Sequence, residues 1–388
     1  MFDPHSWGGS AAKGFRLLRL GALLALAGCD APAPQAGPVC ENAGVICTVV
    51  GTGRSQFDGD GKPASATSLY FPLDVCFDTA GRPLVLDWNN FRVRRVNEDG
   101  TIETVIGNGF EAEPVNGAPA ITTSLHHASD LETDAEGNVY IAGNHASFVF
   151  RIDADGLVAI VAGNGEYGYD GDGGPAKQAA LGAPFGVAPT ADGGFYFSDV
   201  EQHVIRVVDA NGVISTAAGD GVAGYAGDGG PATSARLHGP TRLRVADNGD
   251  LYICDTDNHV IRRIERNGNI TTIAGTGEPG YDGGGGAATA AKFNSPHDLR
   301  FAPDGDLYIA DSGNNVIRRI DRAEIVSTVI GTGVAGFAGD GMAAKDCRLD
   351  RPSGVIFDGE GSMWISDTYN QRVRRVMHFL PALAGRSE

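Results

Sequence analysis

The sequence has little positive charge and almost no long apolar runs. Its 388 residues carry 30 Lys and Arg against 48 Asp and Glu, so the formal net charge is -18. Nucleic acids and anionic lipid surfaces repel such a chain, and we expect no nucleic-acid partner. An apolar run at residues 20–27 lies near the N-terminus. No later run reaches the roughly 18 residues of a membrane-spanning helix.

The N-terminus is typical of an export signal. A basic segment (Lys13, Arg16, Arg19) precedes the apolar run, and Leu26-Ala27-Gly28-Cys29 resembles a bacterial lipobox. This predicts a lipoprotein signal peptide over residues 1–28 and acylation of Cys29, for instance by palmitate. The alternative is ordinary secretion with cleavage near Ala27. Residues 29–44, which include an Ala- and Pro-rich stretch, are predicted to be a tether. The expected location is the bacterial cell envelope, periplasmic or surface-facing, with membrane attachment through the lipid.

Cysteines are few, and their use fits an oxidising compartment. Cys40 and Cys47 lie close together before and within the first expected strand, and we predict a disulfide between them. Cys347 is the competing partner for Cys40. Cys76 and Cys254 fall in apolar strand patterns and are expected to be buried thiols.

A sustained helical period is also missing, whereas a repeat of 56 residues is present. Its opening turn recurs six times without insertion or deletion, at Gly51, Gly107, Gly163, Gly219, Gly275 and Gly331. Each unit contains four short strands separated by turn residues; in the first complete unit they cover residues 73–78, 83–87, 92–96 and 101–106. Six four-stranded antiparallel units predict an all-β, six-bladed β-propeller.

The phase of the repeat predicts how the ring closes. Residues 45–50 match a fourth strand, while the last unit supplies only 353–358, 362–367 and 372–377. The N-terminal strand should therefore complete the last blade, which removes two open sheet edges. The propeller is expected to span residues 45–378, to be followed by a C-terminal tail at 379–388, and to be a monomer.

Three segments of the repeat resemble the NHL-repeat family: residues 184–187 (PFGV), 251–255 (LYICD) and 258–264 (NHVIRRI). The resemblance extends over about 45–377 and implies a six-bladed propeller. It says little about activity, because one fold hosts many functions. Some NHL-repeat propellers are lyases that bind zinc through histidines of separate blades. His203 and His259 are repeat-equivalent turn residues here, and five further histidines lie at other positions of the repeat: His126, His127, His145, His238 and His297. They offer no clear zinc set.

Recurring charges are predicted to be structural. Five blades carry an Asp at the end of the second strand and an Arg seven residues later, a spacing that favours an ion pair. These are Asp87, Asp199, Asp255, Asp311 and Asp367 with Arg94, Arg206, Arg262, Arg318 and Arg374. Blade two has Gly143 and Phe150 instead. The rim residues Asp60, Asp172, Asp228 and Asp340 are expected to form turns, with calcium binding as the alternative.

The blades disagree at the start of their inner strands. Two blades have glycine at this position, Gly186 and Gly354. The other four have a charged residue, and in the last of these a histidine precedes it: Asp74, Asp130, Arg242, His297 and Asp298. These are the candidate ligand-binding residues at the channel mouth. Without Arg242 they are the candidate metal ligands. The alternative is a plug of Asp–Arg pairs between blades.

The sequence favours an envelope-anchored binding or scaffold module for a protein or glycan over an enzyme, because no catalytic constellation stands out. We expect no cofactor, with calcium or zinc as open alternatives. The alternative function is a metal-assisted lyase or lactonase-type hydrolase at the channel mouth. A third is a sensor or spacer within an envelope assembly.

Overall fold

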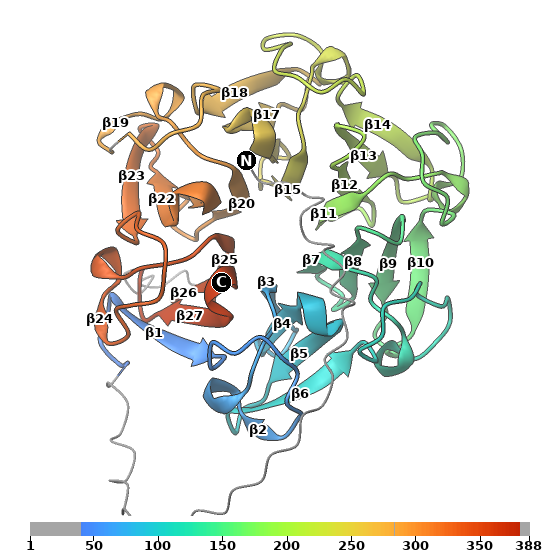
Figure 1. The fold of residues 1–388 in the computed structure, drawn as a ribbon. Coiled ribbons are helices and arrows are strands. Elements are labelled where there is room, and N and C mark those ends of the chain that lie inside the picture. The colour runs from blue at the N-terminus through green and yellow to red at the C-terminus, as the bar shows by residue number, and fades with distance from the viewer. Residues whose placement is uncertain (1–39, 283, 381–388) are drawn as a thin grey trace, which may run out of the picture.

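A computed structural model describes residues 40–282 and 284–380, and over these residues the protein is a ring of six β-sheets around a central channel (Figure 1). Each sheet is one blade of antiparallel strands, and its first strand lines the channel. The all-β six-bladed propeller predicted from the repeat is confirmed. Helical structure in the described residues is confined to one-turn 3-10 helices.

The strands of the first three blades are β3 (Pro72–Phe77), β4 (Pro83–Asp87), β5 (Arg92–Val96) and β6 (Thr101–Ile106); β7 (Ala128–Thr133), β8 (Val139–Gly143), β9 (Phe148–Ile152) and β10 (Val158–Ala162); and β11 (Pro184–Pro189), β12 (Phe195–Asp199), β13 (Val204–Val208) and β14 (Ile214–Ala218). Those of the last three are β15 (Pro240–Val245), β16 (Leu251–Asp255), β17 (Val260–Ile264) and β18 (Ile270–Ala274); β20 (Pro296–Phe301), β21 (Leu307–Asp311), β22 (Val316–Ile320) and β23 (Ile325–Ile330); and β25 (Pro352–Phe357), β26 (Met363–Asp367) and β27 (Arg372–Val376).

The N-terminal strand closes the ring as predicted. Strand β1 (Val45–Val50) pairs antiparallel with β27, with Cys47 opposite Arg375, so it is the outer strand of blade six. A disulfide joins Cys40 to Cys47 at this seam. Blades one, five and six have a fifth, two-residue strand beyond the predicted four: β2 (Lys62–Pro63), β19 (Gly286–Ala287) and β24 (Met342–Ala343). It arises because the long connection into each of these blades folds back along that blade's outer strand.

The 3-10 helices occupy two recurrent places. One set precedes the inner strands: η2 (Ala64–Ala66), η4 (Ala120–Thr122), η5 (Ala176–Gln178), η6 (Ala232–Ser234), η8 (Ala288–Ala290) and η10 (Ala344–Asp346). The other follows the second strands: η3 (Trp88–Asn90), η7 (Thr256–Asn258), η9 (Ser312–Asn314) and η11 (Thr368–Asn370).

Apolar side chains between neighbouring blades make a rigid support for the channel. Leu131, Ile141 and Phe150 of blade two, for example, belong to one buried cluster with Leu86 and Val93 of blade one. Burial of each such side chain stabilises the fold by about 1.5–3 kcal/mol. The packed structure reaches Leu380, which is buried against blade six, slightly beyond the expected boundary at residue 378.

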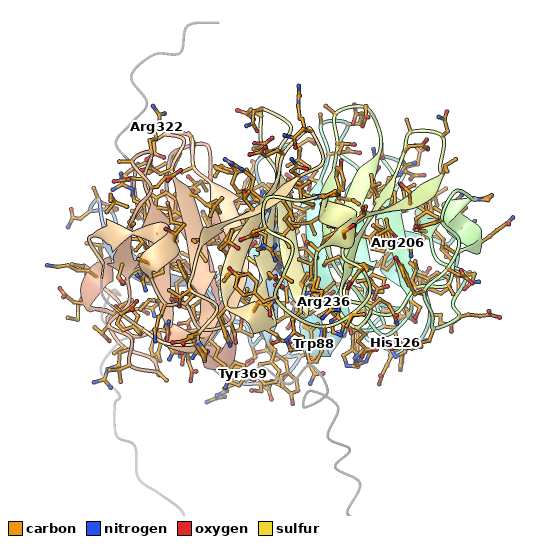
Figure 2. All side chains as sticks on the ribbon, turned by 90° about the horizontal axis from the view of Figure 1, so that it is seen from above. Trp88, His126, Arg206, Arg236, Arg322 and Tyr369 are labelled. Carbon is orange, nitrogen blue, oxygen red and sulfur yellow. A yellow bond between two sulfur atoms is a disulfide. The ribbon has the colours of Figure 1, made fainter. Side chains whose placement is uncertain are left out.

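The propeller has two different faces. We call the face with the long connections and the turns after the second strands the mouth face; the opposite face carries the tight hairpins. Figure 2 shows Trp88, His126 and Tyr369 on the mouth face, with Arg322 of the β22–β23 hairpin on the other. No helix of the described residues is long and apolar enough to cross a membrane.

Candidate functional site

Five blades carry a fully buried arginine on the third strand, as the repeat predicts. In blade one, Arg94 Nη1 lies 3.3 Å from Asp87 Oδ2, and Nη2 lies 2.8 Å from Asp60 Oδ1. Blades four and six repeat this arrangement with Arg262 and Arg374. The predicted strand pair also forms in blade five, between Arg318 and Asp311.

Blade three varies the scheme. Arg206 pairs with the rim carboxylate of Asp172 at 2.6 Å, while Asp199 accepts hydrogen bonds from the backbone N–H groups of Gly182 and Ala183. The four rim carboxylates thus each contact an arginine of their own blade. Blade two lacks both residues, whereas blade five keeps Arg318 but has Gly284 at the rim position.

The charged candidates from the inner strands meet inside the channel. Arg242 Nη1 lies 2.6 Å from Asp74 Oδ1 and 3.5 Å from Asp298 Oδ2, and its Nε lies 3.3 Å from Asp130 Oδ1. Its Nη2 also donates to the carbonyls of Leu73 and Ser129. All four charged side chains are buried, so they form a plug below the mouth, with the guanidinium where a bound cation would sit.

A second layer continues the plug towards the hairpin face. Arg244 Nη2 lies 2.7 Å from Glu132 Oε1 and 3.3 Å from Asp298 Oδ1, and Arg300 also contacts Glu132, at 2.5 Å. Three guanidiniums therefore face four carboxyl groups. Pairing of this kind is what permits charges to be buried at all.

Two of these carboxyl groups have pKa values that are shifted in opposite directions. Burial raises the pKa of Asp74 well above its ordinary value, against the attraction of Arg242. Burial opposes ionisation of Asp130 too, but Arg242 and Arg244 outweigh it and lower the pKa of Asp130. Of these two carboxyl groups, Asp74 is therefore the one that binds a proton more readily.

His297 borders the plug. Its Nδ1 lies 3.0 Å from the carbonyl oxygen of Ser353, and its ring centroid lies 5.2 Å from that of Phe185. Burial, and then the charge of Arg242, lower the pKa of His297 to about 4. The imidazole is therefore neutral at physiological pH, and Nδ1 donates its proton to the carbonyl.

Above the plug, the channel opens into a recess of about 50 Å³ on the mouth face. Two rings of repeat-equivalent residues line it. The first ring consists of the residues that precede the charged position of each inner strand: Leu73, Ser129, Phe185, Thr241 and His297. The second ring consists of the residues that directly follow each second strand: Trp88, Asn144, Val200 and Thr256. The Thr241 and Thr256 hydroxyls lie 2.6 Å apart and fix the polar side of the recess.

Blade two places three histidines beside this recess. His126 and His127 precede β7, and His145 lies in the turn between β8 and β9. Their imidazole nitrogens come within 4.8 Å of one another. Glu111, from the long connection, lies 3.3 Å from both His126 Nε2 and His127 Nδ1. Among residues 40–282 and 284–380 this is the one group of His, Cys, Asp or Glu side chains with such mutual spacing.

The structure thus brings together all five candidates from the inner strands, but as ion pairs and neighbours of Arg242. Sequence reasoning missed Trp88, Phe185 and the histidine group. The ring positions could have been found, because they vary from blade to blade while the strand positions beside them do not. Cys29 lies outside the described residues. Cys76, Cys254 and Cys347 are buried free thiols.

Comparison with known proteins agrees with this architecture. Residues 293–320 match the sequence model of the NHL repeat. Zebrafish (Danio rerio) teneurin-3 is 28% identical over 391 residues, which cover 88% of this chain and 14% of teneurin-3. The chain therefore spans about a seventh of the length of that relative.

Solved structures show the same fold. An auxiliary nutrient binding protein from Bacteroides thetaiotaomicron superposes with a TM-score of 0.63 at 16% identity, over 85% of this chain and 75% of that one. A gluconolactonase from Xanthomonas campestris has a TM-score of 0.51 at 15% identity, over 87% and 98%. At these identities the similarity concerns the fold alone. This chain is therefore a six-bladed β-propeller in which residues 293–320 match the NHL repeat.

Proposed function

We propose that the protein is a binding module of the cell envelope that receives a protein or glycan partner at the mouth face. The observation that carries this proposal is the contrast between repeat positions. Positions that build the blades are nearly constant, whereas the two rings around the recess hold a different set of side chains in almost every blade. Variation at one end of a channel creates an asymmetric, specific surface on a symmetric scaffold.

The chemistry of the recess suits such a partner. Trp88 and Phe185 offer ring faces, and Thr241, Thr256 and Asp257 offer hydroxyl and carboxylate groups. Aromatic rings with a few fixed polar groups are a common composition of binding sites. A recess of about 50 Å³ accommodates one protruding group, so most contact with a partner would be made by the surrounding loops.

Envelope attachment belongs to the same proposal. The Cys40–Cys47 disulfide fits an oxidising compartment, and a protein of the same fold is a nutrient-binding protein. Acylation of Cys29 would supply the anchor. Labelling cells with an alkyne-tagged fatty acid should mark the wild-type chain and not Cys29→Ser. Equal labelling of both chains would remove the anchor from the proposal.

The alternative, a metal-assisted lyase or hydrolase that uses Asp74, Asp130, His297 and Asp298, is the weaker one. The three carboxyl groups surround Arg242, and His297 donates to a backbone carbonyl, so a metal ion would have to displace a buried guanidinium.

Site-specific photocrosslinking tests the proposal. A photoreactive amino acid at Phe185, in the mouth, should capture a partner in intact envelopes. The same amino acid at Pro303, in a hairpin of the opposite face, is the matched control. Capture at 185 and not at 303 supports the proposal. Equal capture at both positions, or none at either, contradicts it.

A further inference from the structure

We propose that His126, His127, His145 and Glu111 form a binding site for a divalent transition-metal ion of the zinc class, at the edge of the mouth on blade two. The inference does not depend on the proposed function. It rests on the convergence of three imidazoles and a carboxylate, on unsatisfied buried nitrogens and on the place of the group in the repeat.

The geometry is close to that of a metal site. The imidazole nitrogens already lie within 4.8 Å of one another, and Glu111 Oε1 contacts two of the rings at 3.3 Å. Ligands around a tetrahedral zinc ion lie about 3.3 Å apart, given Zn–N distances of about 2 Å. The widest nitrogen–nitrogen separation would therefore have to shrink by about 1.5 Å. His145 and Glu111 are exposed, so their side chains have room to make this movement.

The buried histidine gives an independent indication. Only 7% of His127 is exposed, and the Nδ1 atom of His126 is inaccessible to solvent and without a hydrogen bond. The Nδ1 atom of His127 is equally inaccessible and makes no hydrogen bond beyond its 3.3 Å contact with Glu111 Oε1. Buried polar atoms of this kind usually have a partner.

The repeat shows that the group is particular to blade two. At the position of His145, the other blades have Asn89, Glu201, Asp257, Gly313 and Tyr369. The same blade lacks the arginine and both carboxylates that stabilise most other blades, since Phe150, Gly143 and Asn116 replace them. A metal ion would tie the long connection of blade two to its β8–β9 turn, where the other blades use charge pairs.

The ion would also face the recess. His145 lines the recess, and the ring centroid of Trp88, another lining residue, lies 4.6 Å from that of His127. Three imidazoles and Glu111 complete a tetrahedral set, and expansion to five-coordination would admit an oxygen atom of water or a ligand on the side of the recess. The chemical class of ligand that such an ion recognises is a carboxylate or hydroxyl group.

Metal titration of the full chain tests the site. After removal of metal with a chelator, zinc alone should bind at one ion per chain in competition with a chromogenic chelator. Cobalt should give the intense visible absorption of a four-coordinate site. His145→Ala and Glu111→Gln alter exposed side chains and should preserve the fold. Each substitution should weaken zinc binding about tenfold or more, because loss of a residue that merely hydrogen-bonds to a metal ligand already has an effect of this size.

The double variant His203→Ala/His238→Ala is the control. It removes two imidazoles of the same face whose ring centroids lie 5.5 Å apart, outside the proposed group. Unchanged affinity in this control, with weakened binding in the His145 and Glu111 variants, is the expected result. Absence of saturable binding in the wild type, equal affinity in His145→Ala, or loss of binding in the control would each overturn the proposal.

Discussion

Arg242 of blade four donates a 2.6 Å hydrogen bond to Asp74 of blade one, across the channel and 168 residues away in the chain. This contact joins the two sides of the ring. Replacement of the guanidinium by an apolar side chain of similar length would leave Asp130 and Asp298 buried without their main counter-charge. We expect Arg242→Met to lower the free energy of unfolding by about 3–5 kcal/mol in urea denaturation.

Arg236→Met is the matched control for this prediction. Arg236 also lies on the mouth face, but its side chain is half exposed and its partner Asp220 is at the surface. Removal of such a pair should change stability by less than about 1 kcal/mol. Equal effects of the two variants would contradict a role of Arg242 as the centre of the plug.

The opposite pKa shifts of Asp74 and Asp130 give a second prediction. Because Asn resembles a protonated Asp, Asp74→Asn should stay within about 1 kcal/mol of wild-type stability. Asp130→Asn removes a negative charge that Arg242 and Arg244 require, and should cost about 3 kcal/mol or more. Chemical denaturation at pH 7 measures both. The reverse order would place the proton on Asp130.

The buried imidazole of His297 predicts a pH dependence. The pKa of His297 is about 4 in the folded protein, below the ordinary value of about 6.5, so between these values the unfolded chain binds more protons. Stability should therefore fall as pH falls through this window. At pH 5 the free energy of unfolding should be about 2 kcal/mol lower than at neutral pH because of this one group. The facing charges are Arg242, Asp130 and Asp298.

Comparison with His297→Gln isolates this group. The variant should lose less stability than wild type between pH 7 and pH 5, by about 2 kcal/mol, in denaturation curves at the two pH values. Parallel pH profiles would show that His297 is not held neutral.

The two carboxylates that share Arg262 should differ in importance. Asp255 is fully buried and also accepts hydrogen bonds from the His238 backbone and the Asn258 side chain, whereas Asp228 is 45% exposed. Asp255→Ala should cost about 3 kcal/mol or more, and Asp228→Ala less than about 1 kcal/mol. Thermal unfolding of the two variants gives the comparison. A larger loss in Asp228→Ala would show that the rim pair, not the strand pair, holds the blade.

The repeat was enough to predict the blades, the closing strand and most Asp–Arg strand pairs, because these follow from local spacing and from phase. It could not show how far Arg242 reaches. Contact with Asp74 depends on the width of the closed channel, which no local pattern contains. The sequence therefore left both a ligand site and a plug open, and side-chain geometry was needed to see which groups pair.

The histidine group was missed for a related reason. His126 and His145 occupy different repeat positions, so the repeat separates them. They come together because the segment before β7 and the turn after β8 lie on the same face of one blade. His127 also has a left-handed backbone conformation, with a φ of 50°, which sequence spacing does not reveal.

The most direct test of the proposed binding function compares how well variants of the two faces retain a partner. Solubilised envelope components would be passed over immobilised wild-type protein and over Phe185→Ala, Trp88→Ala and Tyr252→Ala; Tyr252 borders a recess on the hairpin face. Thermal unfolding would verify that each variant is folded. We expect the partner captured by the wild-type protein to be lost with the two mouth variants and to be retained by Tyr252→Ala. Retention that survives both mouth variants, or that is lost with Tyr252→Ala, would contradict it.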